Sequence, residues 1–287
     1  MTLTPDQQAA FEGTGYLVLE DALSESDLAC LRTKFDHADT QSRLDDLPNS
    51  DDSFIRLAEH HVSFPLLHRI IGDNIQLRAL RGEKSEPGEA GRGWHKEVAG
   101  ILGVNHAAST VLTQAFYILD DAADTGALWV VPGSHRFKEG LDLPQVAEIR
   151  DMPHSTAIPV RARTAVLLHG NIWQAVSQNG GSSAIRWLRY DYFHCWMRQA
   201  LPKLSAHAEE AASATHNLSQ LFGTVIPHTA AKGYWGREIE GYPSSGGLPE
   251  RRFSRLDLVG RETLLNSELG AFQKLNAATT SGDRDDT

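Results

Sequence analysis

The first forty residues alternate between helical and strand patterns of hydrophobic and polar positions. Thr4 to Gln7 combine a hydroxyl cap, a proline in the first turn and a glutamine three residues after the cap, which is typical of a helix start. The helix should end near Gly13. Tyr16 to Leu19 then have the composition of a strand, and Ser24 begins a second helix with one apolar face. The pattern therefore predicts helix, strand, helix.

The next segment is polar and then returns to a helical period. Residues from about Thr40 to Ser53 are polar and acidic, which indicates a surface loop. Phe54 to Ile71 recover helical periodicity and end at Gly72. Residues 1–74 are thus predicted to be a helical support.

From about Ile75 to Trp196 the hydrophobic period changes to two, which predicts an antiparallel β region. Within it, Ala165–His169 and Ile172–Val176 flank the pair Gly170-Asn171 and resemble a hairpin with a two-residue turn. A further strand is predicted over Ala184–His194. The fold class predicted from these patterns is mainly β with flanking helices.

The end of the chain returns to a helical composition. Ala200 to about Leu221 are rich in Ala and Glu, and the last residues are expected to fray. No repeat or linker divides the chain, so we predict one domain over residues 1–287. Its predicted parts are a helical support (1–74), a β core (75–196), a C-terminal helix with loops (197–275) and a disordered tail (276–287).

Composition and charge exclude several functional classes. Of 287 residues, 41% are hydrophobic and 22% are charged, which suits a globular chain with a sizeable core. The formal net charge is -10, and no basic cluster suggests nucleic acid or an anionic membrane as a partner. No run approaches the ~20 apolar residues of a membrane span, and no leader is recognisable. With only two cysteines, the sequence favours a cytoplasmic location.

His95-Lys96-Glu97 is the candidate metal motif. Residues two apart on a strand point the same way, so His95 and Glu97 can present an imidazole and a carboxylate to one ion. Two other matches, at His37 and His207, lie in segments predicted to be helical, where positions two apart diverge. Context therefore favours His95.

The chain also resembles the phytanoyl-CoA dioxygenase family of iron(II)- and 2-oxoglutarate-dependent oxygenases. The resemblance covers about residues 5 to 195, in the order and approximate spacing of the family. Its most specific part is the Pro-Gly-Ser-His-Arg run after a Gly-x-Leu strand. The residues that carry it are Phe11 to Val18, Trp94 to Glu97, Leu119 to Asp121 and Gly126 to Arg136.

This resemblance implies a double-stranded β-helix, a jelly roll related to the cupins. It also implies that two histidines and a carboxylate hold iron(II) beside 2-oxoglutarate. The family's usual carboxylate is aspartate, where this chain has Glu97, and the family's second histidine corresponds to Gln174. An amide oxygen suits harder ions than an imidazole does, so we expect weaker iron binding. His169 is an alternative source of an imidazole, although the strand register argues against it.

Arg186 corresponds to the family's arginine that grips the distal carboxylate of 2-oxoglutarate. On the predicted strand it shares a face with Leu188 and Tyr190, which indicates an inward side chain. A buried guanidinium must find an anion. The alternative to 2-oxoglutarate is an internal ion pair with Glu97 or Asp191.

The leading functional hypothesis is an iron(II)/2-oxoglutarate oxygenase that hydroxylates a small or carrier-bound organic metabolite. His95, Glu97 and Gln174 would hold the metal, and Arg186 the 2-oxoglutarate. Halogenation is disfavoured because Glu97 retains the carboxylate. The rival hypothesis is a member with a degenerate metal site that performs cyclisation, isomerisation or ligand binding, with His95 and Glu97 as an acid/base pair. A third is a partner subunit of an active relative. The sequence predicts neither the substrate nor the oligomeric state.

Overall fold

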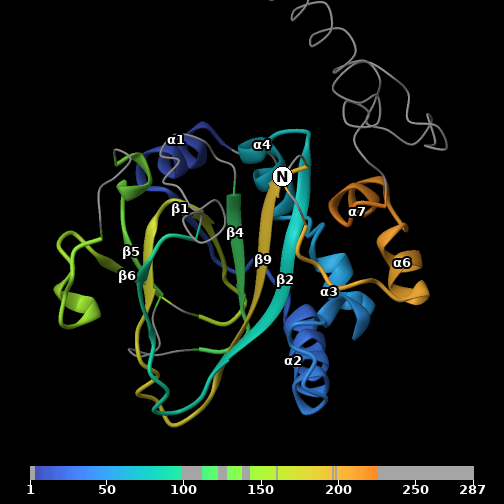
Figure 1. The fold of residues 1–287 in the computed structure, drawn as a ribbon, viewed down its shortest axis with the longest axis horizontal. Coiled ribbons are helices and arrows are strands. Elements are labelled where there is room, and N and C mark those ends of the chain that lie inside the picture. The colour runs from blue at the N-terminus through green and yellow to red at the C-terminus, as the bar shows by residue number, and fades with distance from the viewer. Residues whose placement is uncertain are drawn as a thin grey trace, which may run out of the picture. The chain divides into compact units, whose positions relative to one another are not determined.

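The computed structural model describes residues 4–97, 112–121, 128–137, 143–159, 161–195, 197 and 199–224. Two antiparallel sheets form the centre of this part of the chain (Figure 1). The five-stranded sheet has, in spatial order, β1 (Tyr16–Leu19), β7 (Ala165–His169), β4 (Leu112–Ile118), β9 (Ile185–His194) and β2 (Ile75–Ser85). The four-stranded sheet has β3 (Arg92–His95), β8 (Trp173–Val176), β5 (Leu128–Val131) and β6 (Thr156–Ile158). The prediction of a mainly β jelly roll is confirmed.

The described helices flank these sheets. They are α1 (Pro5–Thr14), α2 (Glu25–Thr40), α3 (Asp52–Leu57), α4 (Phe64–Ile71), α6 (Ala206–Ala212) and α7 (His216–Leu221). Thr4 and Ser24 form the capping boxes that begin α1 and α2. Gly15, at φ 84°, ends α1 in a conformation that favours glycine. None of the described helices has the length and apolar character needed to cross a membrane.

Two predicted helices are each broken into two. The pattern over 54–71 forms α3 and α4, because Pro65 in the first turn of α4 has no N–H to continue a helix from before it. Likewise, the pattern over 200–221 forms α6 and α7, and Ser205 and Thr215 cap one helix each. A helical period alone does not show where one helix stops and the next starts.

The predicted hairpin around Gly170-Asn171 is wrong. Strand β7 pairs with β1 and β4, whereas β8 pairs with β3 and β5. The turn therefore carries the chain from one sheet to the other. The Gly170 N–H donates to the carbonyl of Leu112 at 2.8 Å, which binds the turn to β4. Local turn chemistry predicts a sharp reversal, but it does not show which strand becomes the neighbour.

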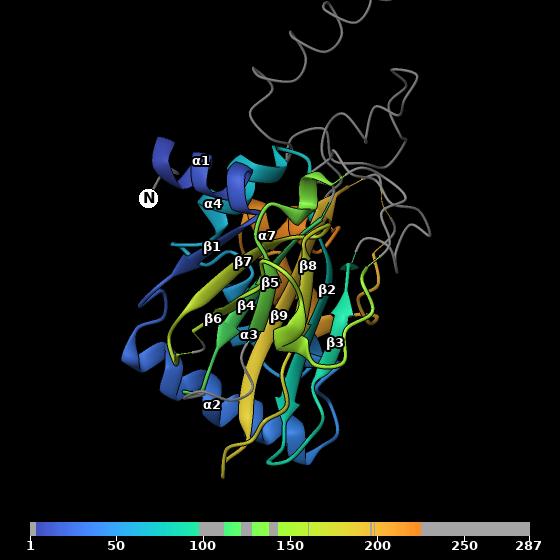
Figure 2. The same ribbon diagram turned by 90° about the vertical axis from the view of Figure 1, so that its left-hand side faces the viewer.

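Each face of the five-stranded sheet contributes to a different hydrophobic core. The outer face packs on the helices, with Leu188, Tyr190 and Tyr192 of β9 beside residues of α2, α3 and α4 (Figures 1 and 2). The inner face packs on the four-stranded sheet, with Ile185 and Trp187 of β9. Successive residues of β9 therefore point to opposite sides. Because both sides are buried, the strand has almost no exposed position.

The predicted domain boundaries stay predictions. The expected tail at 276–287, most of the predicted 197–275 region and the run from Gly126 to Ala127 lie outside the described residues. The same holds for residues 98–109.

Candidate active site

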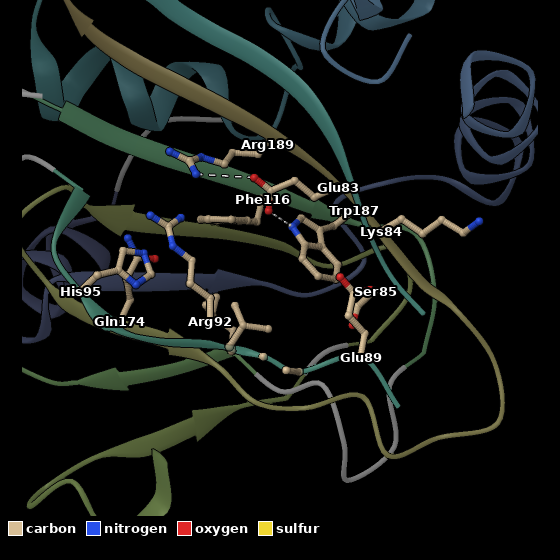
Figure 3. A pocket seen from close by; sticks show the side chains of 14 residues that line it. Glu83, Lys84, Ser85, Glu89, Arg92, His95, Phe116, Gln174, Trp187 and Arg189 are labelled. Atoms are coloured by element: carbon tan, nitrogen blue, oxygen red, sulfur yellow. Dashed lines mark hydrogen bonds and ion pairs between the residues drawn. The ribbon is translucent and has the colours of Figure 1, made fainter. Parts of the chain in front are cut away.

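A pocket of about 280 Å³ opens between the two sheets (Figure 3). Its apolar wall comes from the inner faces of three strands and includes Phe116, Leu128 and Trp187. Its polar lining includes Arg92, His95, Gln174, Glu83 and Arg189. A mixed apolar and polar lining of this kind is typical of a site for a small organic ligand.

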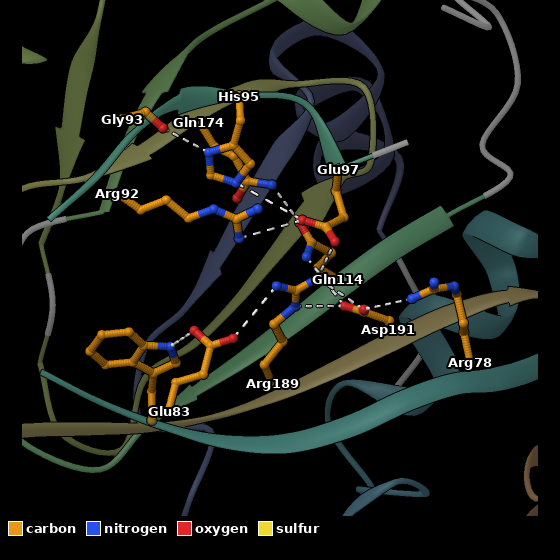
Figure 4. A network of polar contacts seen from close by, with 11 residues as sticks. Arg78, Glu83, Arg92, Gly93, His95, Glu97, Gln114, Gln174, Arg189 and Asp191 are labelled. Carbon is orange, nitrogen blue, oxygen red and sulfur yellow. Dashed lines mark hydrogen bonds and ion pairs between the residues drawn. The ribbon is translucent and has the colours of Figure 1, made fainter. Parts of the chain in front are cut away.

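Three predicted site residues lie close to one another, and two of them, His95 and Gln174, line the pocket. His95 on β3 lies directly opposite Gln174 on β8 in the strand register. Glu97 follows β3, and its Oε2 lies 3.9 Å from Nε2 of His95 (Figure 4). That separation is too long for a hydrogen bond. The structure thus places residues 95, 97 and 174 close together.

The His95 ring is oriented by the backbone. Its Nδ1 lies 2.9 Å from the carbonyl oxygen of Gly93, and a carbonyl only accepts hydrogen bonds, so Nδ1 carries the proton. Burial lowers the pKa of His95 below its ordinary value, with nearby arginines adding to the effect. The ring is therefore neutral near pH 7, and the lone pair of Nε2 points to the side of Glu97.

The two carboxylate oxygens of Glu97 have different surroundings. Oε1 lies 2.6 Å from Nη2 of Arg189, in a close ion pair. Oε2 is buried and accepts no hydrogen bond from the residues that the structure describes. Its neighbours are Nε2 of His95 at 3.9 Å and Nη1 of Arg92 at 3.8 Å. A buried, unsatisfied carboxylate oxygen indicates a place for a ligand or an ion.

Arg189 connects Glu97 to a buried polar network (Figure 4). Its side chain is 4% exposed, and it donates from Nε and Nη2 to the two oxygens of Asp191, each at 2.9 Å. Burial by itself opposes a charged guanidinium, but Asp191, Glu97 and Glu83 raise the pKa of Arg189 above its usual value. Arg189 is a permanent cation beside the candidate site.

Gln174 is held by the same network. Its amide nitrogen donates to Oε1 of Gln114 at 2.6 Å, and the amide of Gln114 donates to Asp191 at 3.2 Å. This chain of hydrogen bonds assigns the amide orientation. Since the nitrogen of Gln174 is engaged, its carbonyl oxygen is the atom that remains for a cation.

The prediction that Arg186 points into the pocket is wrong. Arg186 does share a face with Leu188 and Tyr190, but that face packs on the helices. Its guanidinium makes a bidentate ion pair with Asp120 at 2.7 and 2.8 Å and a second pair with Asp36 of α2. The hydrogen bonds that it donates to Asp120, and then to Asp36, raise the pKa of Arg186 above its usual value. The ion-pair alternative therefore holds, although with partners other than Glu97 and Asp191.

His169 does not replace Gln174. It lies on the face of β7 that is turned to α1, with its ring 6.1 Å from Phe11 and 4.9 Å from His135. Burial, followed by the neighbouring His135, lowers the pKa of His169 to about 3. Its Nδ1 accepts from the backbone of Asn171 at 3.1 Å. As the strand register suggested, His169 stays out of the pocket lining.

Sequence reasoning missed Arg189. The signal was present in the alternation of β9, because Trp187, Arg189 and Asp191 share the face opposite to Arg186. What hid it was the stronger apolar pattern at Leu188, Tyr190 and Tyr192, which marks the helix-covered face.

Comparison with known proteins agrees with this geometry. The sequence profile described as phytanoyl-CoA dioxygenase (PhyH) matches residues 11–186. The chain belongs to the phytanoyl-CoA dioxygenase family. No curated protein sequence matches it. The family resemblance predicted from the motifs is thereby confirmed.

Solved structures with the same fold include members that hold metal and 2-oxoglutarate. EctD from S. alaskensis, with 2-oxoglutarate and 5-hydroxyectoine, is 17% identical with a TM-score of 0.60, over 68% of this chain and 78% of that one. HygX from Streptomyces hygroscopicus, with nickel and 2-oxoglutarate, is 16% identical with a TM-score of 0.57, over 69% and 90%. The carbocyclase SnoK, described as non-heme and alpha-ketoglutarate-dependent, is 17% identical with a TM-score of 0.55, over 67% and 84%.

The cofactors predicted from the resemblance, iron and 2-oxoglutarate, occur in these solved structures, since HygX has forms with iron and with nickel and 2-oxoglutarate, and EctD has 2-oxoglutarate. The donors in this chain fit a divalent ion in part. His95 offers a neutral nitrogen and Glu97 an unsatisfied oxygen, while Gln174 offers a neutral amide oxygen. Among the described residues, no three His, Cys, Asp or Glu side chains gather to hold a metal. Among the described residues, the amide of Gln174 is therefore the candidate third donor, and an amide oxygen binds iron(II) less well than an imidazole does.

Proposed function

We propose that this chain is an enzyme that oxidises a small organic molecule in the pocket with iron(II) and 2-oxoglutarate, and that hydroxylation is its reaction. The observation that supports this most is the pairing of Nε2 of His95 with Oε2 of Glu97. Both atoms have free lone pairs, and they face one another at 3.9 Å without a hydrogen bond. This arrangement suits an ion between them.

In this proposal His95 and Glu97 hold the metal, and the carbonyl oxygen of Gln174 is the third ligand. Bound iron(II) supplies oxidation by molecular oxygen, coupled to decarboxylation of 2-oxoglutarate. The hydrogen bond to the carbonyl of Gly93 keeps His95 in the tautomer with a free Nε2. The hydrogen bond from Gln174 to Gln114 keeps the amide oxygen of Gln174 available.

The rest of the pocket serves binding and exclusion of water. Phe116, Leu128 and Trp187 provide apolar surface for the body of a small metabolite. Arg92 has a side chain that is 56% exposed, and Glu97 is 3.8 Å away, so its guanidinium is accessible to an acidic group of a ligand. Because Arg186 is occupied elsewhere, Arg92 is the accessible pocket cation that we assign to such a group.

The test is an anaerobic iron(II) titration of the purified protein, followed by measurement of succinate formed from 2-oxoglutarate with candidate substrates. We expect one iron per chain, and succinate formation that His95→Gln abolishes. Absence of iron binding, together with absence of 2-oxoglutarate decarboxylation for every substrate tried, would overturn the proposal.

A second function is favoured by one observation, the ion pair between Glu97 and Arg189 at 2.6 Å. A carboxylate already neutralised by a guanidinium suits a metal-independent site, in which His95 and Glu97 exchange protons with a substrate during cyclisation or isomerisation, or anchor a ligand. Activity or binding that survives complete removal of metal by a chelator supports this function. Loss of activity on chelation, with recovery on iron(II), supports the first one.

A further inference from the structure

The contact between Arg189 and Glu97 has a direct consequence for any metal at this site. The guanidinium lies 2.6 Å from one oxygen of the carboxylate whose other oxygen faces His95. Its position is fixed, because Arg189 is buried and is bound to both oxygens of Asp191. A divalent ion ligated by Glu97 would therefore lie close to a permanent positive charge.

The network is neutral without an ion. The ion pairs drawn in Figure 4 link three cations and three anions among the described residues, namely Arg78, Arg92 and Arg189 with Glu83, Glu97 and Asp191. A divalent ion would add two uncompensated charges to this partly buried group.

We propose that Arg189 competes with a divalent metal for the charge of Glu97, and that this competition, more than the amide at Gln174, sets the metal affinity of this chain. The inference rests on the proposed function, since it assumes that the pocket takes a metal. Arg189 is a positioning residue here: it fixes Glu97 by one oxygen and leaves only Oε2 for the ion. Gln174 lowers the metal affinity because its amide oxygen is a weaker ligand for the ion than an imidazole nitrogen. Arg189 lowers it because its positive charge repels the ion over several ångströms in a medium of low dielectric.

The experiment is a titration of the full chain with manganese(II), read as the loss of the free-ion signal in electron paramagnetic resonance, which needs no activity. The variants are Arg189→Gln and Gln174→His, and the matched control is Arg78→Gln. Arg78 lies 3.7 Å from Asp191 in the same network but has no contact with Glu97 in the structure. We expect Arg189→Gln to tighten binding by about tenfold or more, Gln174→His to tighten it less, and Arg78→Gln to stay within about threefold of the unmodified chain.

The outcomes separate the inference from the proposed function. If the unmodified chain binds manganese(II) and Arg189→Gln binds it no more tightly than Arg78→Gln does, the inference is overturned and the proposed function stands. If neither the unmodified chain nor any variant binds manganese(II), both are overturned.

A second variant covers the case in which Arg189→Gln does not fold. Glu97→Asp shortens the carboxylate by one methylene, which withdraws it from Arg189 and leaves the pair of Arg189 with Asp191 in place. We expect Glu97→Asp to tighten manganese(II) binding as well. Binding that is unchanged or weaker in Glu97→Asp, with folding confirmed by circular dichroism, counts against the competition.

Discussion

The two faces of β9 carry arginines three residues apart that have different tasks. On the helix-covered face, Arg186 joins Asp36 of α2 and Asp120 and lies at the edge of an apolar core that includes Leu188. On the pocket face, Arg189 joins Asp191 to Glu97 and lies against open volume. Both guanidinium groups are neutralised by carboxylates. Among the described residues, the second pairs with a carboxylate that has a buried oxygen without a hydrogen bond, which makes the pocket face the candidate for a ligand.

The comparison shows that the direction of a side chain decides its chemistry, even where residue type and strand are shared. On the helix-covered face, the tyrosine hydroxyls have hydrogen-bond partners on the helices' side. The hydroxyl of Tyr190 donates to the carbonyl of Phe54, and that of Tyr192 donates to the carbonyl of Ala58, each at 2.8 Å. The pocket face leaves hydrogen-bonding capacity unused. Changes on the first face should therefore affect stability, and changes on the second should affect binding.

The largest effect is expected for Leu188→Ala on the helix-covered face. Leu188 is 0% exposed, and removal of a buried leucine side chain leaves a cavity. We expect the free energy of unfolding to fall by about 3 kcal/mol, measured by urea denaturation. Manganese(II) binding by the folded fraction should not change. If Leu188→Ala weakens the metal affinity and leaves stability intact, the two faces of β9 do not have separate roles in stability and binding.

A pH dependence is expected from His169, which faces α1 and not the pocket. Its pKa is lowered to about 3 in the folded protein, against about 6.5 in an unfolded chain. As the pH falls below 6.5, the unfolded chain takes up the proton first, so stability that is fully present above that pH is lost as the pH falls toward 3. Between pH 7.5 and 5, this histidine should cost about 2 kcal/mol of unfolding free energy.

His169→Asn is the matched variant for this test, because its amide oxygen can accept the hydrogen bond from Asn171 that Nδ1 now accepts. Urea denaturation at the two pH values should show a smaller loss of stability for His169→Asn than for the unmodified chain. Equal losses would mean that His169 is accessible to protons in the folded protein.

A smaller effect is expected for Arg186→Gln, which removes the ion pairs with Asp120 and Asp36. Arg32, with its Nε 3.4 Å from Asp120, stays as a partial partner. We therefore expect a loss of about 1 to 2 kcal/mol in unfolding free energy and unchanged binding of 2-oxoglutarate, measured by calorimetry. If Arg186→Gln instead abolishes 2-oxoglutarate binding and leaves stability unchanged, Arg186 binds 2-oxoglutarate, as the family resemblance implied.

Local rules predicted much of the fold. The caps at Thr4 and Ser24, the strand period after Ile75 and the strand at 184–194 all occur as expected, because they depend on neighbours in the chain. The partner of β8 was not predictable in this way, since strand pairing is settled by contacts distant in sequence. The motif at His95 and Glu97 followed from the strand period and the context of the match, whereas Gln174 was located through the family resemblance.

The face of β9 was misjudged for a physical reason. In a strand with one buried face, the apolar residues mark the interior of the sheet pair. Here helices bury the other face as well, so the apolar run at Leu188 and Tyr190 marks the helix side, while the interior face has Arg189 and Asp191 at the pocket. Only the packing of helices α2 to α4 on the sheet distinguishes the two faces of β9, and that packing depends on contacts between residues distant in sequence.

The smallest change in stability and the clearest change in binding are expected at His95. Its ring makes one hydrogen bond to the carbonyl of Gly93 and is not part of the larger cores, so His95→Gln should alter the unfolding free energy by about 1 kcal/mol or less. The decisive measurement is the titration of the unmodified chain and of His95→Gln with manganese(II), at equal protein concentration and with folding confirmed. One saturable ion per chain, lost in His95→Gln, is the result expected if residues 95, 97 and 174 form a metal site. No saturable binding, or binding that His95→Gln leaves unchanged, would contradict it.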